Sequence, residues 1–215
     1  MHLKRQKSPK SWPIHRKGTK YVVRPSSNIN KGIPLLIVLR DLLKIAKRRK
    51  EVKRAIYMKQ ILINNKLAKD EKNSLFLFDT LTIIPLKKSY RIEILENGKI
   101  GLKEIKDNES KYKISKIINK KILKGNKTQL NLLDGRNFLS EIKCNVNDSV
   151  IIDFDKNKIE KCIPLQEKSQ VFVFSGRYAG QRGSVIKIDK KNKMAEVVIG
   201  NHKANILIKK IIALE

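Results

Sequence analysis

Three glycines and two arginines stand close together in the stretch VFVFSGRYAGQRGSVIKI, which covers residues 171–188. Glycine-rich loops bind phosphate in many nucleotide-binding proteins, because their backbone N–H groups can approach an anion closely. A P-loop of that kind needs the pattern G-x-x-x-x-G-K-[ST] and a following helix. Here Gly176, Gly180 and Gly183 are spaced four and three residues apart, the lysine is missing, and a strand pattern follows. The loop therefore does not predict a nucleotide site.

Histidines, the commonest acid–base residues, are scarce and scattered. The chain has only His2, His15 and His202, of which the third lies between two strand patterns, where a turn is expected. General acid–base catalysis and metal binding need titratable groups that converge on one point. The positions of the histidines favour surface roles, so we expect no enzyme activity, no metal ion and no cofactor.

Two pairs of residues deserve a separate interpretation because their types bind metals elsewhere. Asp153 and Asp155 share one face of a strand pattern, but they resemble a Mg²⁺ site only superficially, and we interpret them as solvated charges at a sheet edge. Cys144 and Cys162 form no C-x-x-C motif and lie far from any histidine in sequence. We interpret them as small apolar side chains in a reducing compartment.

The charge of the chain indicates a polyanionic partner. The formal net charge is +29, and residues 1–69 supply +18 of it, with 20 basic residues against Asp41 and Glu51. Such self-repulsion favours nucleic acid as the partner. A membrane is the weaker alternative, because the longest apolar run, IPLLIVL at 33–39, is far shorter than the ~20 residues that span a bilayer. Without a secretory signal pattern, a cytoplasmic protein is expected.

Residues 1–36 form a basic segment without a helical or strand period of useful length. We predict that this tail is disordered alone and ordered on its partner. The planar side chains of His2, Trp12, His15 and Tyr21 alternate with cations, which favours a specific RNA-threading tail over a nonspecific cation cloud. The candidate RNA contacts here are Lys4, Arg5, Lys7, Lys10, Trp12, Arg16, Lys17, Lys20 and Arg24.

From Pro34 onward the apolar spacing becomes helical. The stretch PLLIVLRDLLKIAK predicts one helix and RRKEVKRAIYMKQ a second. Two strand-like runs at 61–68 and 74–84 follow, the first with the turn-prone pair Asn64-Asn65, and together they predict a hairpin. The candidate phosphate contacts on the outer helix faces are Arg40, Lys44, Lys47, Arg48, Arg49, Lys50, Lys53 and Arg54.

The middle of the chain, about 86–165, alternates short strand patterns with turn signals. Asn97-Gly98 and Asp134-Gly135 supply the positive φ that a two-residue hairpin turn needs. The charge is mixed, and nothing in this segment indicates catalysis. A β-rich domain is expected here.

The glycine-rich loop resembles the KOW motif, a strand–loop–strand unit with glycines at fixed spacing. The matching positions are Val171, Val173, Gly176, Gly180, Gly183, Val185 and Ile188. In proteins that carry it, the motif belongs to a small Src-homology-3-like β-barrel found in ribosomal proteins and transcription elongation factors. The resemblance implies such a barrel at the C-terminal end, with Ser175, Arg177, Tyr178 and Arg182 at an RNA-facing tip.

The order of several further segments resembles the archaeal and eukaryotic small-subunit ribosomal protein family S-four-e. These segments are HLKR, SPKSWPI, VVRPSSN, GIPLLIVLRDLLKIAK, EVKRAI, ILINNK and VNDSVIID. The resemblance covers essentially the whole chain and implies a noncatalytic protein that binds small-subunit rRNA and neighbouring ribosomal proteins. The end at Glu215, without the extension of eukaryotic members, favours an archaeal-type member.

Together these observations predict an α+β protein of several modules. The expected modules are a tail at 1–36, a small RNA-binding fold of two helices and a hairpin at 37–84, a family-specific β-rich domain at 85–167 and the barrel at 168–215. Two alternatives remain open: an RNA-modifying enzyme with an appended RNA-binding module, such as a pseudouridine synthase, and a KOW-type transcription elongation factor. No small-molecule substrate and no membrane partner are expected.

Overall fold

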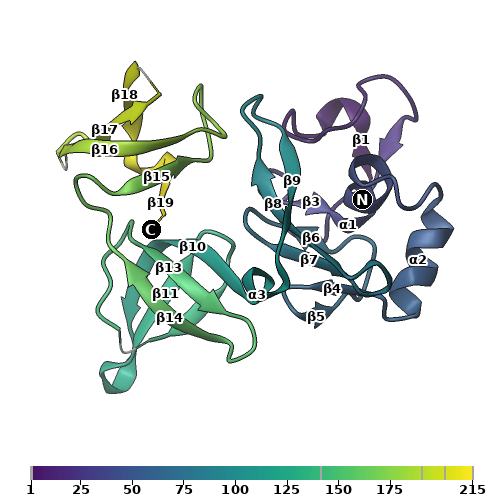
Figure 1. Ribbon diagram of the computed structural model, residues 1–215, viewed down its shortest axis with the longest axis horizontal. Helices are drawn as coiled ribbons and strands as arrows, with labels where there is room; N and C mark the ends of the chain where they lie inside the picture. Colours follow the sequence, from purple (N-terminus) through teal and green to yellow (C-terminus); the bar gives the residue numbers. More distant parts are fainter. Residues whose placement is uncertain (1, 141, 190, 201, 215) are drawn as a thin grey trace. The chain divides into compact units, whose positions relative to one another are not determined.

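The computed structural model describes residues 2–140, 142–189, 191–200 and 202–214, and it divides into two compact units (Figure 1). The N-terminal unit comprises Met1–Ile94 and Lys99–Lys111, and the C-terminal unit comprises Leu95–Gly98 and Tyr112–Glu215. Both are rich in strands, and helices are few. The fold is therefore a mixed α and β architecture dominated by antiparallel sheet.

The elements of the N-terminal unit are short, apart from one helix and two strands. They are β1 (Leu3–Lys4), η1 (Arg5–Lys7), β2 (Tyr21–Val22), β3 (Ile33–Pro34), α1 (Leu35–Ile37), η2 (Val38–Leu42), α2 (Arg49–Tyr57), β4 (Ile61–Ile63), β5 (Lys66–Leu67), β6 (Ser74–Leu75), β7 (Thr80–Ile83), η3 (Ile84–Leu86), β8 (Lys88–Ile94), β9 (Ile100–Ile105) and α3 (Asp107–Ser110).

One antiparallel sheet with the order β5-β4-β7-β8-β9 organises this unit. The turn between β4 and β5 forms where predicted, because Asn64 and Asn65 take positive φ values of 51° and 58°. Strand β7 also pairs with β8, from Thr80↔Arg91 to Ile83↔Lys88. The module boundary expected between residues 84 and 85 thus falls inside a sheet, since turn signals mark chain reversals and not domain limits.

The first helix is shorter than predicted. It runs through α1 and the π-helical turn η2, in which the N–H of Leu43 donates to the carbonyl of Val38 at 2.9 Å. Lys44 then takes a φ of 54°, which ends the helix. The apolar spacing continues through Ala46, which packs into the core from a non-helical segment. Periodicity alone therefore placed the helix end too late.

Residues 2–36 fold onto the N-terminal unit, contrary to the prediction of a tail that is disordered alone. Strand β1 pairs with β2, and β3 pairs with β6. Trp12 is only 2% exposed, belongs to the core, and donates from Nε1 to the carbonyl of Gly32 at 3.2 Å. The signal was missed because the apolar residues occur singly and are buried through contacts with distant segments.

The C-terminal unit is built almost entirely of strands. Its elements are β10 (Tyr112–Ile122), η4 (Lys124–Asn126), β11 (Thr128–Leu132), β12 (Asn137–Leu139), β13 (Ser149–Asp153), β14 (Lys158–Ile163), β15 (Gln170–Val173), β16 (Arg182–Asp189), β17 (Met194–Ile199), β18 (His202–Leu207), η5 (Ile208–Lys210) and β19 (Ile211–Ala213).

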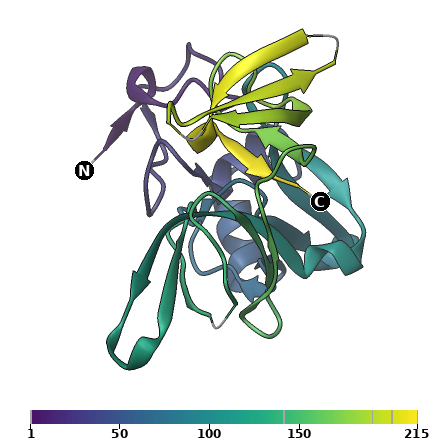
Figure 2. The same cartoon turned by 90° about the vertical axis from the view of Figure 1, so that its left-hand side faces the viewer.

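Two five-stranded antiparallel sheets form this unit, with the orders β12-β11-β10-β13-β14 and β18-β17-β16-β15-β19. Each has its own apolar cluster, the first around Ile117 and Ile152 and the second around Val171 and Val197. The long strand β10 pairs first with β13 and then with β11. Beyond β13 it continues with β11 as a ribbon that ends in the turn η4 (Figure 2).

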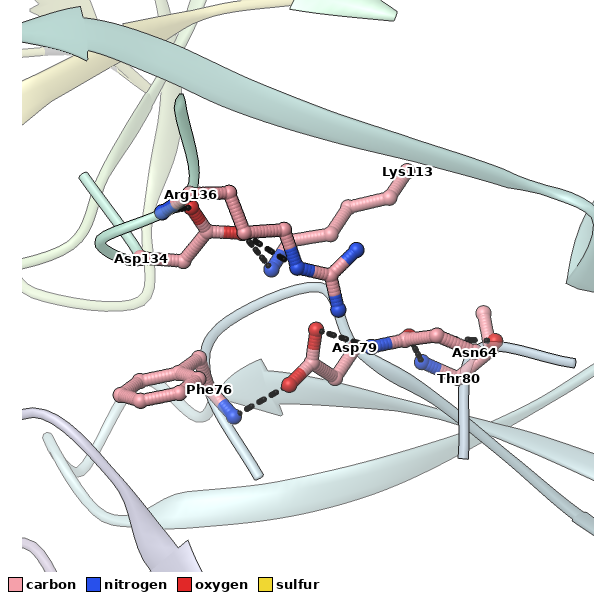
Figure 3. A network of polar contacts seen from close by, with 7 residues as sticks. All are labelled: Asn64, Phe76, Asp79, Thr80, Lys113, Asp134 and Arg136. Carbon is pink, nitrogen blue, oxygen red and sulfur yellow. Dashed lines mark hydrogen bonds and ion pairs between the residues drawn. The ribbon is translucent and has the colours of Figure 1, made fainter. Parts of the chain in front are cut away.

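A buried polar cluster fixes the β4–β5 turn in the N-terminal unit (Figure 3). The carboxylate of Asp79 accepts from Nδ2 of Asn64 at 2.9 Å and from the N–H of Phe76 at 2.7 Å. The amide oxygen of Asn64 accepts from the N–H of Thr80 at 3.0 Å. Buried polar groups need such partners, so this cluster determines how the turn lies on β7.

A separate buried ion pair lies in the C-terminal unit and is also drawn in Figure 3. Nζ of Lys113 lies 2.8 Å from Oδ2 of Asp134, and their side chains are only 1% and 4% exposed. Burial raises the pKa of Asp134, but the Lys113 ammonium and a hydrogen bond from the N–H of Arg136 outweigh it and lower the pKa overall. The pair ties β10 to the turn between β11 and β12.

Candidate nucleic-acid interface

Helix α2 carries cations because only a narrow stripe of it is buried. Val52 is 1% exposed, and Ala55 and Ile56 are half-buried against the same core. The helix begins where the carboxylate of Glu51 accepts from the N–H groups of Lys47 and Arg48, at 2.7 and 3.3 Å. These two backbone hydrogen bonds, that of Lys47 first, lower the pKa of Glu51. One of the two acids in residues 1–69 is thus a helix cap.

The remaining faces of α2 and of the segment before it are exposed and basic. We call them the α2 surface and define it by Lys44, Lys47, Arg48, Lys50, Lys53 and Arg54. All six are exposed, as the sequence predicted for the outer helix faces. Since phosphate contacts need exposed cations, this surface has the chemistry to lie on a nucleic-acid backbone.

Two of the predicted phosphate contacts are also paired with acids. Nη2 of Arg40 lies 2.8 Å from Oδ2 of Asp41, and this hydrogen bond raises the pKa of Arg40. Arg49 donates from Nε to Oε1 of Glu71 at 2.7 Å and pairs with the same oxygen through Nη2. The Glu71 side chain is 1% exposed, so Arg49 is held in place by a buried carboxylate. Sequence reasoning missed Glu71, which lies far from Arg49 in the chain.

In the N-terminal segment, two predicted contacts have structural roles. The guanidinium of Arg5 donates to the carbonyls of Thr19 and His15, each at 2.7 Å, and to Oγ1 of Thr19 at 2.8 Å, so it holds the loop of residues 15–19. Trp12 lies in the core and cannot stack on a base in this conformation, so the expectation for Trp12 is wrong. Its burial, which no local pattern reveals, is the physical reason.

The other predicted cations of this segment lie at the surface. Lys4, Lys7, Lys10, Arg16, Lys17 and Lys20 are exposed, and Arg24 is half-buried. Arg24 and Arg49, which are distant in sequence, line the same hollow together with Lys72. Lys72 was not predicted, because only the fold brings its loop to this place.

The glycine-rich loop joins β15 to β16 in the C-terminal unit. The two ends of the loop are joined by a hydrogen bond from the N–H of Gly180 to the carbonyl of Val173 at 2.8 Å. Gly180 has a φ of 89°, which an L-residue rarely adopts. Gly176 has a φ of 104° for the same reason. The glycines thus shape a tight turn, as the sequence predicted.

The side chains of this loop lie at different depths. Ser175, Arg177 and Arg182 are exposed, and Tyr178 is half-buried against the apolar cluster of the second sheet. The guanidinium carbon of Arg177 lies 5.9 Å from the centre of the Tyr178 ring. The loop therefore presents cations beside an aromatic ring that is partly covered by the protein.

Groups that could hold a metal ion do not converge within the described residues. No cluster of three or more His, Cys, Asp or Glu side chains among them could hold a metal ion.

Asp153 is 5% exposed and accepts from the N–H groups of Asp155 and Lys156, so it is a buried turn residue and not a solvated edge charge. Burial raises the pKa of Cys162, beside Cys144, to about 12, which keeps its thiol protonated.

Comparison with known proteins gives consistent results for the N-terminal segment and the middle of the chain. A family model described as "Ribosomal family S4e" matches residues 86–159, and one described as "RS4NT (NUC023) domain" matches residues 1–27. The chain is 36% identical over 203 residues to "Small ribosomal subunit protein eS4" of Methanocella arvoryzae, covering 92% of this chain and 86% of the relative. For the protein of that name from Methanothermobacter thermautotrophicus the identity is 37% over 191 residues, covering 87% and 79%.

A solved structure shares the fold. The crystal structure of the 30S ribosomal protein S4e from Thermoplasma acidophilum aligns with a TM-score of 0.75 at 22% sequence identity, covering 86% of this chain and 95% of that chain. Within the residues described, the structure contains no helix that is both long and apolar enough to cross a membrane.

Proposed function

The chain belongs to the ribosomal protein family S4e, and on this basis we propose that it binds the RNA of the small ribosomal subunit through the α2 surface and neighbouring cations. It is a structural constituent of that subunit and not an enzyme. Family membership rules against the two alternatives, an RNA-modifying enzyme and a transcription elongation factor. We further propose that it acts in the cytoplasm, within the ribosome, beside other small-subunit proteins.

Residues 1–69 carry a large excess of cations, and their two acids are both engaged within the protein. This excess of exposed positive charge is the main support for RNA binding. Asp41 is paired with Arg40, and Glu51 caps α2. The six cations of the α2 surface are exposed on one continuous stretch of chain. Phosphate contacts position a protein on RNA without reading sequence, so shape and stacking must supply the specificity.

Salt dependence tests this proposal. If about ten cations meet phosphates, the affinity for small-subunit rRNA should fall with salt at a log–log slope of about −7 to −9. The triple variant Lys50→Gln, Lys53→Gln, Arg54→Gln should reduce that slope by about 2 to 3, because each lost phosphate contact removes about 0.7 to 0.9. These three positions leave the Arg49–Glu71 pair and the Glu51 cap intact.

A matched control removes the same charge from the C-terminal unit. The triple variant Lys158→Gln, Lys187→Gln, Lys203→Gln replaces exposed lysines on β14, β16 and β18. We expect it to change the slope by less than about 1. A wild-type slope near −2, or equal effects of both triple variants, would contradict the proposed interface.

The loop between β15 and β16 is proposed as a second RNA contact. The strand order of the second sheet and the turn geometry of its glycines support a small Src-homology-3-like barrel of the KOW type. Arg177 and Arg182 supply exposed cations at its tip. Sedimentation of the tagged protein with small subunits, and not with RNA polymerase, is expected on a sucrose gradient.

A further inference from the structure

A hollow of about 510 Å³ lies in the N-terminal unit, where β1 and β2 approach the start of α2. In Figure 1, β1 and α2 lie on the same side of this unit. The volume is within the range of sites that hold small ligands, about 300 to 1,000 Å³. The residues that give it chemical character are His2, Tyr21, Arg24, Arg49 and Lys72.

The charge of the hollow fits an anion. Arg24, Arg49 and Lys72 contribute three cations from three separate segments, and the carboxylate of Glu71, which is paired with Arg49, offsets one of them. The buried carboxylate of Glu71 fixes Arg49 through Nε and Nη2. Arginine has five N–H donors in a rigid fork, so Nη1 retains donors for a phosphate oxygen.

The aromatic groups of the hollow fit a planar ligand. Tyr21 is 48% exposed, and Nζ of Lys20 lies 5.6 Å from the centre of its ring. The ring of His2 lies 5.4 Å from that of Tyr21 at an angle of 46°. Because about half of Tyr21 is exposed, part of its ring is accessible to a third ring. Aromatic side chains beside cations are typical of sites for unpaired RNA bases.

We propose that this hollow receives one unpaired nucleotide of the small-subunit rRNA, with its base against Tyr21 and a phosphate on Arg24, Arg49 and Lys72. The inference rests on the rRNA binding proposed above. A paired base is stacked on both faces, so only a nucleotide that leaves its helix can enter. In the tail model a disordered protein segment enters the RNA, whereas in this proposal a nucleotide of the RNA enters a folded part of the protein.

Substitutions in the full-length protein separate stacking from charge. Tyr21→Leu should weaken binding to transcribed small-subunit rRNA about 5- to 150-fold, the range for one stacked base, while leaving the salt slope unchanged. Tyr112→Leu is the matched control, since Tyr112 is 37% exposed on β10, outside the hollow and outside the α2 surface, and it should change affinity less than twofold. Lys72→Gln should reduce the salt slope by about 0.7.

A second measurement keeps the test independent of variant folding. Ultraviolet irradiation of the wild-type complex, followed by mass spectrometry, should find a nucleotide attached to a peptide that contains His2 or Tyr21. If wild type binds rRNA but this crosslink is absent and Tyr21→Leu binds as tightly as Tyr112→Leu, the nucleotide site is wrong and the proposed function stands. If wild type shows no salt-dependent rRNA binding, the proposed function itself fails.

Discussion

Lys116 shows how a single residue can join two sheets of the C-terminal unit. Lys116 is 2% exposed. Its Nζ donates to the carbonyl of Ile211 at 2.8 Å and also to the carbonyl of Ile208. Lys116 lies on β10, whereas its acceptors lie in η5 and β19. Burial lowers the pKa of Lys116 from its usual 10.5 to about 8. The contact is therefore sensitive to pH.

The free energy of unfolding should depend on this lysine above neutral pH. Between about pH 8 and 10.5 the unfolded chain binds more protons at Lys116 than the folded chain, so stability rises with pH. We expect a gain of about 1 kcal/mol from pH 7 to 9 in urea unfolding. Lys116→Met should abolish this gain and leave two carbonyls without their donor. The same pH dependence in Lys116→Met and wild type would disprove the linkage.

At the scale of elements, the pairing of β16 with β17 depends on a position without a side chain. Gly183 pairs with Val171 of β15, and a Cβ atom built on it would lie 2.3 Å from the carbonyl oxygen of Val198 on β17. No rotamer can relieve that overlap, because the obstacle is backbone. The strands can approach this closely only with glycine at 183.

Gly183→Ala should therefore separate β16 from β17 and destabilise the second sheet by about 1 to 3 kcal/mol. Hydrogen exchange is the suitable measurement, and the amides of β17 should lose protection. Ser184→Ala, at the neighbouring exposed position, serves as the control and should stay within about 0.5 kcal/mol of wild type. Unchanged protection in Gly183→Ala would mean that the sheet relaxes around the added methyl.

At the scale of the whole molecule, the basic N-terminal segment is also part of a core. Leu3 and Trp12 belong to the same apolar cluster as Leu36 and Leu81 of the N-terminal unit. The segment that contains Leu3 and Trp12 is therefore folded before any RNA is present. RNA binding then has less chain to order, which lowers its entropic cost.

The single tryptophan of the chain, Trp12, tests this arrangement directly. In the free protein, its fluorescence should resist iodide quenching and shift to the red only on unfolding, because the indole is buried. Trp12→Ala should destabilise the N-terminal unit by about 3 to 5 kcal/mol. The exposed variant Tyr57→Ala should stay within about 0.5 kcal/mol of wild type. Efficient iodide quenching of Trp12 in the absence of RNA would show that the indole is exposed and would support the prediction of a disordered tail.

The class of partner, the cationic face of α2 and the tight turns could be predicted from the sequence without knowledge of the fold. Net charge is independent of fold, the spacing that buries Val52 and exposes Lys53 is local, and positive φ at Asn64 and Gly176 follows from residue type. Each of these properties depends on neighbouring residues or on none. They could therefore be predicted without knowing which distant segments meet.

The roles of residues whose partners lie far away in the chain depend on the tertiary structure. It buried Trp12, paired Arg49 with Glu71 and brought Lys72 beside Tyr21 and Arg24. It also continued the sheet past residue 84 and ended the first helix at Lys44. Burial and ion pairing are set by contacts between segments, and no local spacing encodes them. The nucleotide-sized hollow is accordingly a property of the folded unit alone.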